Sequence, residues 1–113
     1  MSEEEKQKGV CRQYGAEFVA APVGMKVGIS AAALRGEQPL HGLRHAPMGD
    51  TTGWYIWSGA YSDDPDFFQP LHVEHLSDAC PASIKFLGLA PGWRFLFADG
   101  HEDAWYDENL LRD

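Results

Sequence analysis

The strongest structural signal in the chain is the stretch Trp93-Arg94-Phe95-Leu96-Phe97-Ala98-Asp99-Gly100-His101-Glu102-Asp103-Ala104-Trp105-Tyr106. Its first part, residues 93–98, has the alternation of a β-strand. Asp99-Gly100 is a turn signal, because glycine readily adopts the positive φ that tight hairpin turns require. Residues 102–106 would then return antiparallel to residues 93–98. The stretch therefore predicts a β-hairpin.

A second strand signal lies upstream, in Gly53-Trp54-Tyr55-Ile56-Trp57-Ser58-Gly59. Successive side chains of a strand point to opposite faces, so Trp54 and Ile56 would share one face of the sheet. Tyr55 and Trp57 would share the other. One face must join the core. The other is either a binding face, since Tyr and Trp are frequent interface anchors, or a second core layer.

The amino-terminal half predicts one helix, two short strands and a long loop. Ser2 followed by Glu5 is a capping-box pattern, and the helix that it starts would run to Tyr14 and end at Gly15. Beyond this helix, composition and turn residues predict strands over residues 17–21 and 25–29, then a loop over 30–52 with one helical turn at 31–34.

A second helical region is predicted over residues 70–88. Pro81 divides it, because proline fits the first turn of a helix and not its interior. Strands and helices together indicate an α+β fold, a small and mostly antiparallel sheet with helices packed on one face. No repeat or linker divides the chain, so residues 1–113 are predicted to form a single domain.

Composition excludes several classes of protein. A length of 113 residues with 44% hydrophobic residues suits one folded domain and argues against intrinsic disorder. No apolar run approaches the roughly 20 residues of a transmembrane helix, which excludes an integral membrane protein. The opening residues are acidic, unlike a signal peptide, and predict a cytoplasmic protein. The net charge of −8 argues against nucleic-acid binding, because phosphates attract Lys and Arg.

The acidic residues are unevenly distributed. Between His45 and Ile84 there are six acidic residues and no Lys or Arg. Three of them, Asp63, Asp64 and Asp66, belong to a predicted turn beside the aromatic strand. Such a surface would steer a basic partner, although it could equally be an ordinary solvated surface. The candidate partner-binding residues are Asp63, Asp64, Asp66, Tyr55 and Trp57.

Catalytic and metal-binding motifs are missing from the sequence. His41 and His45 are four residues apart but have no third ligand beside them, and His72 and His75 lack the spacing of a zinc protease. Cys11 and Cys80 are predicted to be reduced, unreactive core thiols, since two cysteines cannot form a disulfide framework. We therefore expect no catalytic residue, no metal and no cofactor.

Three blocks of sequence resemble the immunity protein 33-like family, which is related to a domain of unknown function. The blocks are residues 53–59, residues 66–76, and residues 87–96 with the following Tyr106-Asp107. The resemblance implies a small bacterial protein that acts as an antidote to a polymorphic toxin. It supplies no catalytic or toxin-binding residue.

The main hypothesis from the sequence is a non-catalytic cytoplasmic immunity protein that binds one cognate toxin. A basic toxin would match the acidic surface, and this inference comes from charge rather than from the family. Two alternatives remain at this point: a small-ligand-binding or regulatory domain, and a small enzyme that uses the histidines.

Overall fold

The computed structural model describes residues 2–112, so Met1 and Asp113 of the predicted domain lie outside the described residues. Its sheet has six strands in the order β4-β1-β3-β2-β5-β6. The strands are β1 (Lys26–Ser30), β2 (Leu40–Arg44), β3 (Thr51–Ser58), β4 (Phe68–His72), β5 (Trp93–Ala98) and β6 (His101–Tyr106). Only β1 and β3 pair in parallel, which confirms the mostly antiparallel sheet.

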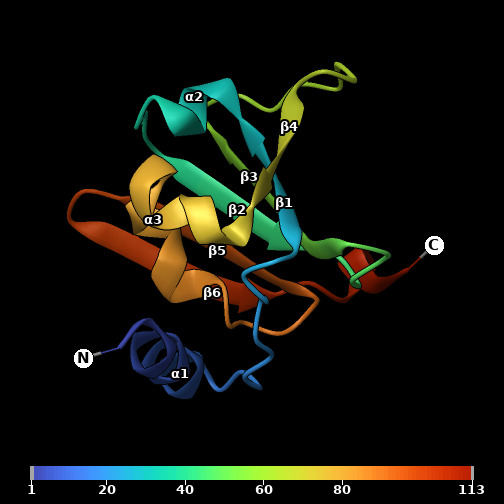
Figure 1. Ribbon diagram of the computed structural model, residues 1–113. Helices are drawn as coiled ribbons and strands as arrows, with labels where there is room; N and C mark the ends of the chain where they lie inside the picture. The colour runs from blue at the N-terminus through green and yellow to red at the C-terminus, as the bar shows by residue number, and fades with distance from the viewer. Residues whose placement is uncertain (1, 113) are drawn as a thin grey trace.

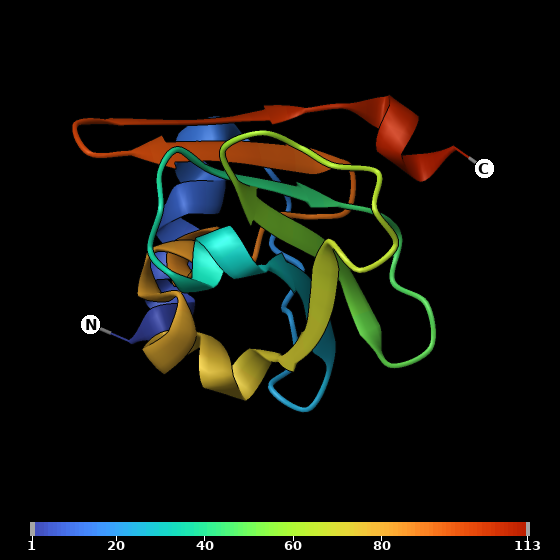
Figure 2. The same cartoon turned by 90° about the horizontal axis from the view of Figure 1, so that it is seen from above.

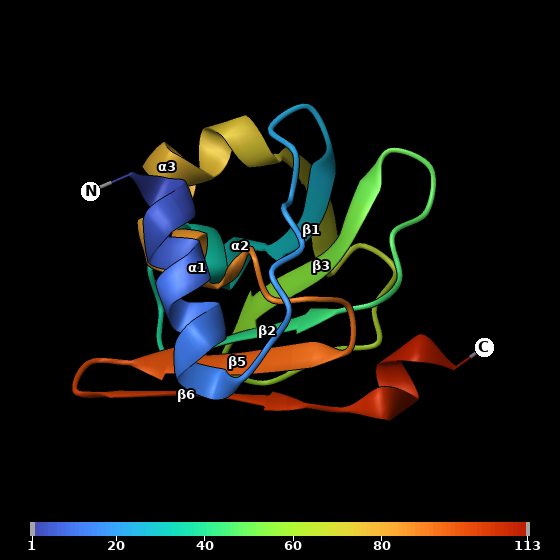
Figure 3. The same cartoon turned by 90° about the horizontal axis from the view of Figure 1, so that it is seen from below.

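The helices pack on one side of this sheet, which curves around them (Figures 1 and 2). They are α1 (Glu3–Tyr14), α2 (Ala31–Leu34), η1 (Val73–His75), α3 (Leu76–Ala79) and η2 (Pro81–Phe86). A further short helix, η3 (Glu108–Leu111), lies apart from the others, near the carboxyl terminus (Figure 3). The predicted α+β class, with helices on one face of a small sheet, is confirmed.

Local sequence signals account for α1 and for the hairpin. The Ser2 hydroxyl accepts a hydrogen bond from the Glu5 amide, and Gly15 ends α1 with a φ of 74°. Strands β5 and β6 pair antiparallel, as predicted, with Arg94 opposite Trp105. Gly100 has a φ of 80° in the turn between them. Both predictions are confirmed.

The core lies between the sheet and the helices. Trp54 and Ile56 are fully buried there, which confirms that they share one face of β3 and identifies it as the core face, a choice that the sequence left open. The Trp54 indole donates a hydrogen bond of 3.0 Å to the Leu87 carbonyl, so its one polar atom is satisfied. The rings of Phe86 and Phe95 stack with centroids 4.3 Å apart, which joins η2 to β5.

Arg44 is the exceptional core residue, with only 1% of its surface exposed. Its guanidinium donates to five backbone carbonyls, those of Val19, Ala20, Thr52, Leu87 and Leu89. Burial lowers the pKa of Arg44 to about 10, so it stays charged at neutral pH. One buried cation therefore ties together three segments that are distant in sequence.

Several predicted elements are wrong. Residues 17–21 form no strand beyond a single bridge from Phe18 to Leu89, because the carbonyls of Val19 and Ala20 bond to Arg44 instead. The predicted loop over 30–52 contains the helical turn α2, as expected, but also the unpredicted central strand β2. The sequence did not predict this strand because Gly42 lies in its middle, and glycine is a weak strand former.

The predicted helical region over 70–88 begins too early. Residues 70–72 belong to β4, which pairs only with β1 and is an edge strand. An edge strand tolerates Pro70, because one side of its backbone needs no ladder partner. The helical residues that follow form η1, α3 and η2, with Pro81 at the start of η2 as predicted.

Candidate protein-interaction surface

The face of the sheet that points away from the helices carries a layer of aromatic and apolar side chains. Strand alternation assigns to this face His41, Leu43, Tyr55, Trp57, Phe68, Arg94, Leu96 and Trp105. His41 and Trp57, on neighbouring strands, stack with ring centroids 5.1 Å apart. We call this side of the sheet the outer face.

The loop between β3 and β4 folds back onto the outer face. Its Tyr61 ring lies 5.5 Å from the ring of Trp57 and 6.1 Å from that of Phe68. Tyr61 is nevertheless 57% exposed, whereas Trp57 is only 6% exposed. Trp57 is therefore a buried support beneath an exposed tyrosine.

The predicted acidic turn belongs to the same loop. The amide of Phe67 donates to the Asp64 carbonyl, which closes the turn around Pro65. The Asp64 carboxylate accepts a hydrogen bond of 2.8 Å from the Asp66 amide, so this side chain shapes the loop as well as charging it. Asp63, Asp64 and Asp66 are all exposed, which confirms the predicted turn and leaves their carboxylates available to a partner.

The five candidate partner-binding residues thus lie on β3 and on the loop that follows it. Tyr55 is half-buried, with its ring 5.1 Å from that of Phe68. The structure gives Tyr55 and the three aspartates accessible surface, and gives Trp57 a supporting position. Their contact with a partner stays a prediction.

A hollow of about 210 Å³ opens beside Tyr55. It is lined by Leu43, His45, Tyr55, Tyr61 and Phe68. Among these residues the sequence proposed only Tyr55 for partner binding, and His45 was considered only as a metal ligand. The nearest signal in the sequence is the placing of Tyr61 and Phe68 on either side of the acidic turn, but their approach depends on the loop folding back.

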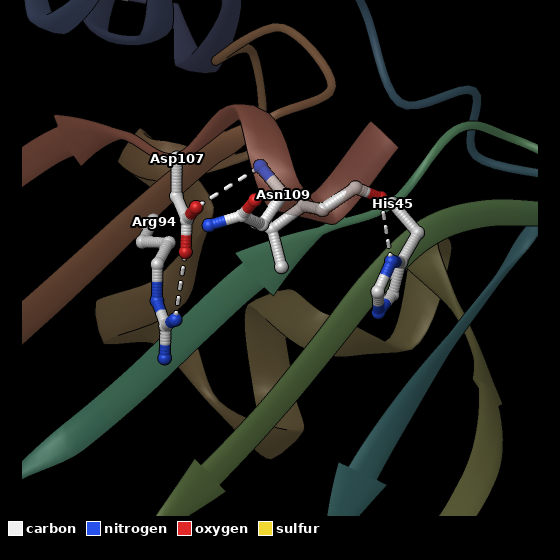
Figure 4. A network of polar contacts seen from close by, with 5 residues as sticks. His45, Arg94, Asp107 and Asn109 are labelled. Atoms are coloured by element: carbon white, nitrogen blue, oxygen red, sulfur yellow. Dashed lines mark hydrogen bonds and ion pairs between the residues drawn. The ribbon is translucent and has the colours of Figure 1, made fainter. Parts of the chain in front are cut away.

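A polar network fixes the chain beside this hollow (Figure 4). The His45 Nδ1 atom lies 2.9 Å from the Leu110 carbonyl oxygen, which joins η3 to the end of β2. Arg94 donates a hydrogen bond of 3.2 Å to Asp107, whose other carboxylate oxygen accepts from the Asn109 amide. The bond from Arg94 is the main cause that holds the pKa of Asp107 below its ordinary value.

The histidines and cysteines have structural surroundings. Burial is the main cause that lowers the pKa of His41, and burial raises the pKa of both Cys11 and Cys80. The two cysteines are buried free thiols, as predicted. Across residues 2–112 no three His, Cys, Asp or Glu side chains gather as a metal-ligand set. None of the helices in the same range is long and apolar enough to span a membrane.

The model of one protein family, the Imm33-like domain, matches residues 6–107. The chain belongs to the Imm33-like family. This confirms the resemblance drawn from the three sequence blocks. Comparison with curated proteins and with solved structures gave no significant match.

The match covers the whole sheet of this Imm33-like domain, the acidic loop and every residue that lines the hollow. Only η3 and the residues at either end of the chain lie outside it. The outer face is thus part of the family's domain rather than an addition to it.

Proposed function

We propose that this Imm33-like domain is a bacterial immunity protein that binds a cognate toxin in the cytoplasm and neutralises it without catalysis. The observation that carries the proposal is the outer face, an aromatic surface on the side of the sheet away from α1, α2, α3 and η2, bordered by an exposed acidic loop. The family name supports an immunity role and leaves the binding surface open.

The aromatic part of this surface suits protein binding. Tyr61 is largely exposed, and its ring packs against those of Trp57 and Phe68. A supported aromatic side chain loses little conformational entropy when a partner covers it, which is why Tyr and Trp dominate binding hot spots. The exposed Trp105 on β6 extends the aromatic surface across the sheet.

The charge of this surface indicates a basic partner. Asp63, Asp64 and Asp66 are exposed, and their segment of sequence contains no Lys or Arg from residue 46 to residue 84. An acidic patch raises the rate of encounter with a basic surface and disfavours acidic competitors. A toxin that attacks nucleic acids would present such a basic surface, and an antidote bound there would block its substrate.

Co-expression tests the proposal directly. Cells carrying a toxin gene adjacent to this gene should grow when the domain is co-expressed, and the purified proteins should form a stable complex. The quadruple variant Tyr61→Ala, Asp63→Asn, Asp64→Asn, Asp66→Asn, which keeps a hydrogen-bond acceptor at position 64, should fold but protect poorly. Toxicity that persists with soluble wild-type domain present, or protection without a complex, would contradict the proposal.

Small-ligand binding is the second candidate function, because an apolar hollow of about 280 Å³ lies between α2 and the start of η2. Its lining includes Ala33, Leu40 and Phe97. The volume lies just below the roughly 300–1,000 Å³ typical of ligand pockets, so this candidate is the weaker one. A metabolite that raises the melting temperature in proportion to its concentration would favour it.

A further inference from the structure

The hollow on the outer face has walls made of aromatic rings at steep angles. The rings of Tyr55 and Phe68 meet at 70°, and those of His45 and Tyr55 at 78°. Tyr61 adds a third wall, inclined at 55° to Phe68. Three of the rings that line the hollow, those of Tyr55, Tyr61 and Phe68, belong to the aromatic types whose electron-rich faces attract a cation.

The rings of the hollow have no cation of their own within the part of the chain that the structure describes. The cation–aromatic contacts of residues 2–112 involve other rings, those of Phe18, Trp54, Phe86, Phe97 and Trp105. The loop that supplies Tyr61 also carries Asp63 and Asp64 two and three residues later. The loop that forms one wall of the hollow is thus acidic, which favours the approach of a positively charged group.

His45 adds a hydrogen-bond acceptor to the lining. The Leu110 carbonyl can only accept, so the His45 Nδ1 atom, 2.9 Å away, donates to it, as in the tautomer that carries its proton on Nδ1. This leaves Nε2 with a free lone pair. A donor that enters beside the ring can bond to it.

The size of the hollow favours a small group over a drug-sized ligand. At about 210 Å³ it is smaller than the pockets that hold drug-sized ligands, which start at roughly 300 Å³, and it is open to the surface. A single long side chain that protrudes from another protein fits such a space.

We propose that this hollow binds an arginine side chain of the partner. Guanidinium is planar, stacks on aromatic faces, gives up its hydration more readily than ammonium, and can donate to His45 Nε2. The inference rests on the proposed function, since it supplies the group by which a basic toxin would be anchored. It identifies Tyr55, Tyr61 and Phe68 as the residues that recognise that group.

A titration with small probes tests the hollow without any toxin. N-acetyl-arginine methylamide should shift the ring resonances of Tyr55, Tyr61 and Phe68 in NMR spectra and saturate with a weak affinity. The citrulline analogue has nearly the same shape and no charge, and should bind about two- to five-fold more weakly, the ratio expected for an exposed cation–π contact of about 0.5–1 kcal/mol. The lysine analogue should fall between them. Equal affinity for arginine and citrulline, or shifts confined to other rings, would overturn the proposal.

Variants of Tyr61 distinguish the loss of its aromatic ring from a general destabilisation of the fold. Tyr61→Leu should weaken arginine binding by the same two- to five-fold, and Tyr61→Phe, which keeps the ring, should restore most of it. Tyr106→Leu is the matched control, because Tyr106 is 52% exposed on β6, outside the hollow, and its loss should change nothing. If Tyr61→Leu binds the arginine probe with the affinity of the wild type, the proposal is overturned.

The two proposals fail in different ways. If Tyr61→Leu binds the toxin as tightly as the wild type does, the hollow is not the anchor, while the immunity function stands. If the arginine probe binds as expected but the domain neither binds nor neutralises the toxin, the hollow stands and the immunity function fails.

Discussion

The two faces of the sheet each carry an arginine, and the two residues differ in almost every respect. Arg44 on the inner face is 1% exposed and bonds to five backbone carbonyls. Arg94 on the outer face is partly exposed and pairs with one carboxylate, that of Asp107. On the inner face, the Arg44 guanidinium links backbone segments that are distant in sequence. On the outer face Trp105 stays exposed, as does Tyr61 of the loop that packs on it, and this is the side where we propose that a partner binds.

The largest effect should follow from removing the buried cation. Arg44→Met keeps the length of the side chain but removes the donor of five carbonyls, of which only that of Leu87 keeps another side-chain donor, the Trp54 indole. Each buried group left unsatisfied costs about 1–3 kcal/mol. We expect the free energy of unfolding to fall by at least about 3 kcal/mol, measured by urea denaturation. Arg44→Lys should lie between, since an ammonium has three donors. A loss below about 1 kcal/mol for Arg44→Met would show that the inner face does not depend on this residue.

The second prediction concerns the packing of the inner face. A Cβ at position 42 would lie 2.0 Å from the Phe95 ring, whereas a Cβ at Gly24 would contact nothing within 4 Å. Gly42→Ala should therefore lower the free energy of unfolding by about 1–3 kcal/mol, as overpacking does. Gly24→Ala is the control and should be neutral or slightly stabilising. Equal thermal unfolding midpoints for the two variants would contradict the close packing at Gly42.

A third prediction concerns the hairpin of β5 and β6, at one edge of the sheet. Gly100 has a φ of 80°, a conformation that costs a β-branched residue about 1–2 kcal/mol. Gly100→Val should lower the free energy of unfolding by that amount, while Gly100→Asn should lose less because Asn tolerates this conformation. Urea unfolding curves measure the stability of the two variants. Equal stability for Gly100→Val and Gly100→Asn would contradict the role of the positive φ.

The hairpin and α1 could be predicted because their signals are local. Asp99-Gly100 and the pair Ser2 and Glu5 act on neighbouring backbone, whatever the rest of the chain does. Strand β2 could not be predicted in this way. Gly42 is explained only by the Phe95 ring more than fifty residues away, and Arg44 only by carbonyls on three distant segments.

The candidate surface was predictable to a similar degree. Alternation along β3 placed Tyr55 and Trp57 on the face opposite Trp54, and charge marked the acidic turn. The burial of Trp57 was not predictable, because Tyr61 reaches it only after the loop folds back. Nor was the hollow, whose lining comes from three strands and two connecting segments.

A fourth prediction tests the ion pair of the outer face. Because Arg94 lowers the pKa of Asp107, the folded state binds a proton at this site less readily than the unfolded state does. The pair therefore stabilises the fold above the ordinary pKa of Asp, and this stability is lost as the pH falls through the lowered value. Asp107→Asn should unfold at a lower urea concentration than the wild type at pH 7, and the difference should shrink toward pH 2. A difference that is constant over this range would contradict the role of charge.

The smallest effect on stability is expected for the acidic loop, where the effect on binding should be clear. Exposed charges contribute about 0–1 kcal/mol, and Asn at position 64 can still accept the hydrogen bond from the amide of residue 66. The triple variant Asp63→Asn, Asp64→Asn, Asp66→Asn should therefore melt within about 2 °C of the wild type. Its association with a basic toxin should slow by roughly three- to ten-fold at low ionic strength and by less in high salt.

A matched control decides whether the loop or the total charge is responsible for that slowing. Glu17→Gln, Glu74→Gln, Asp78→Asn changes the net charge equally at three exposed residues outside the loop. If steering depends on where the acids lie, the control associates almost as fast as the wild type in stopped-flow measurements, and only the loop variant is slow. Equal slowing of both variants would assign the effect to net charge alone. If the loop variant associates at the wild-type rate, the turn is only a solvated surface. The toxin would then bind the aromatic side chains of the outer face without electrostatic steering by these acids.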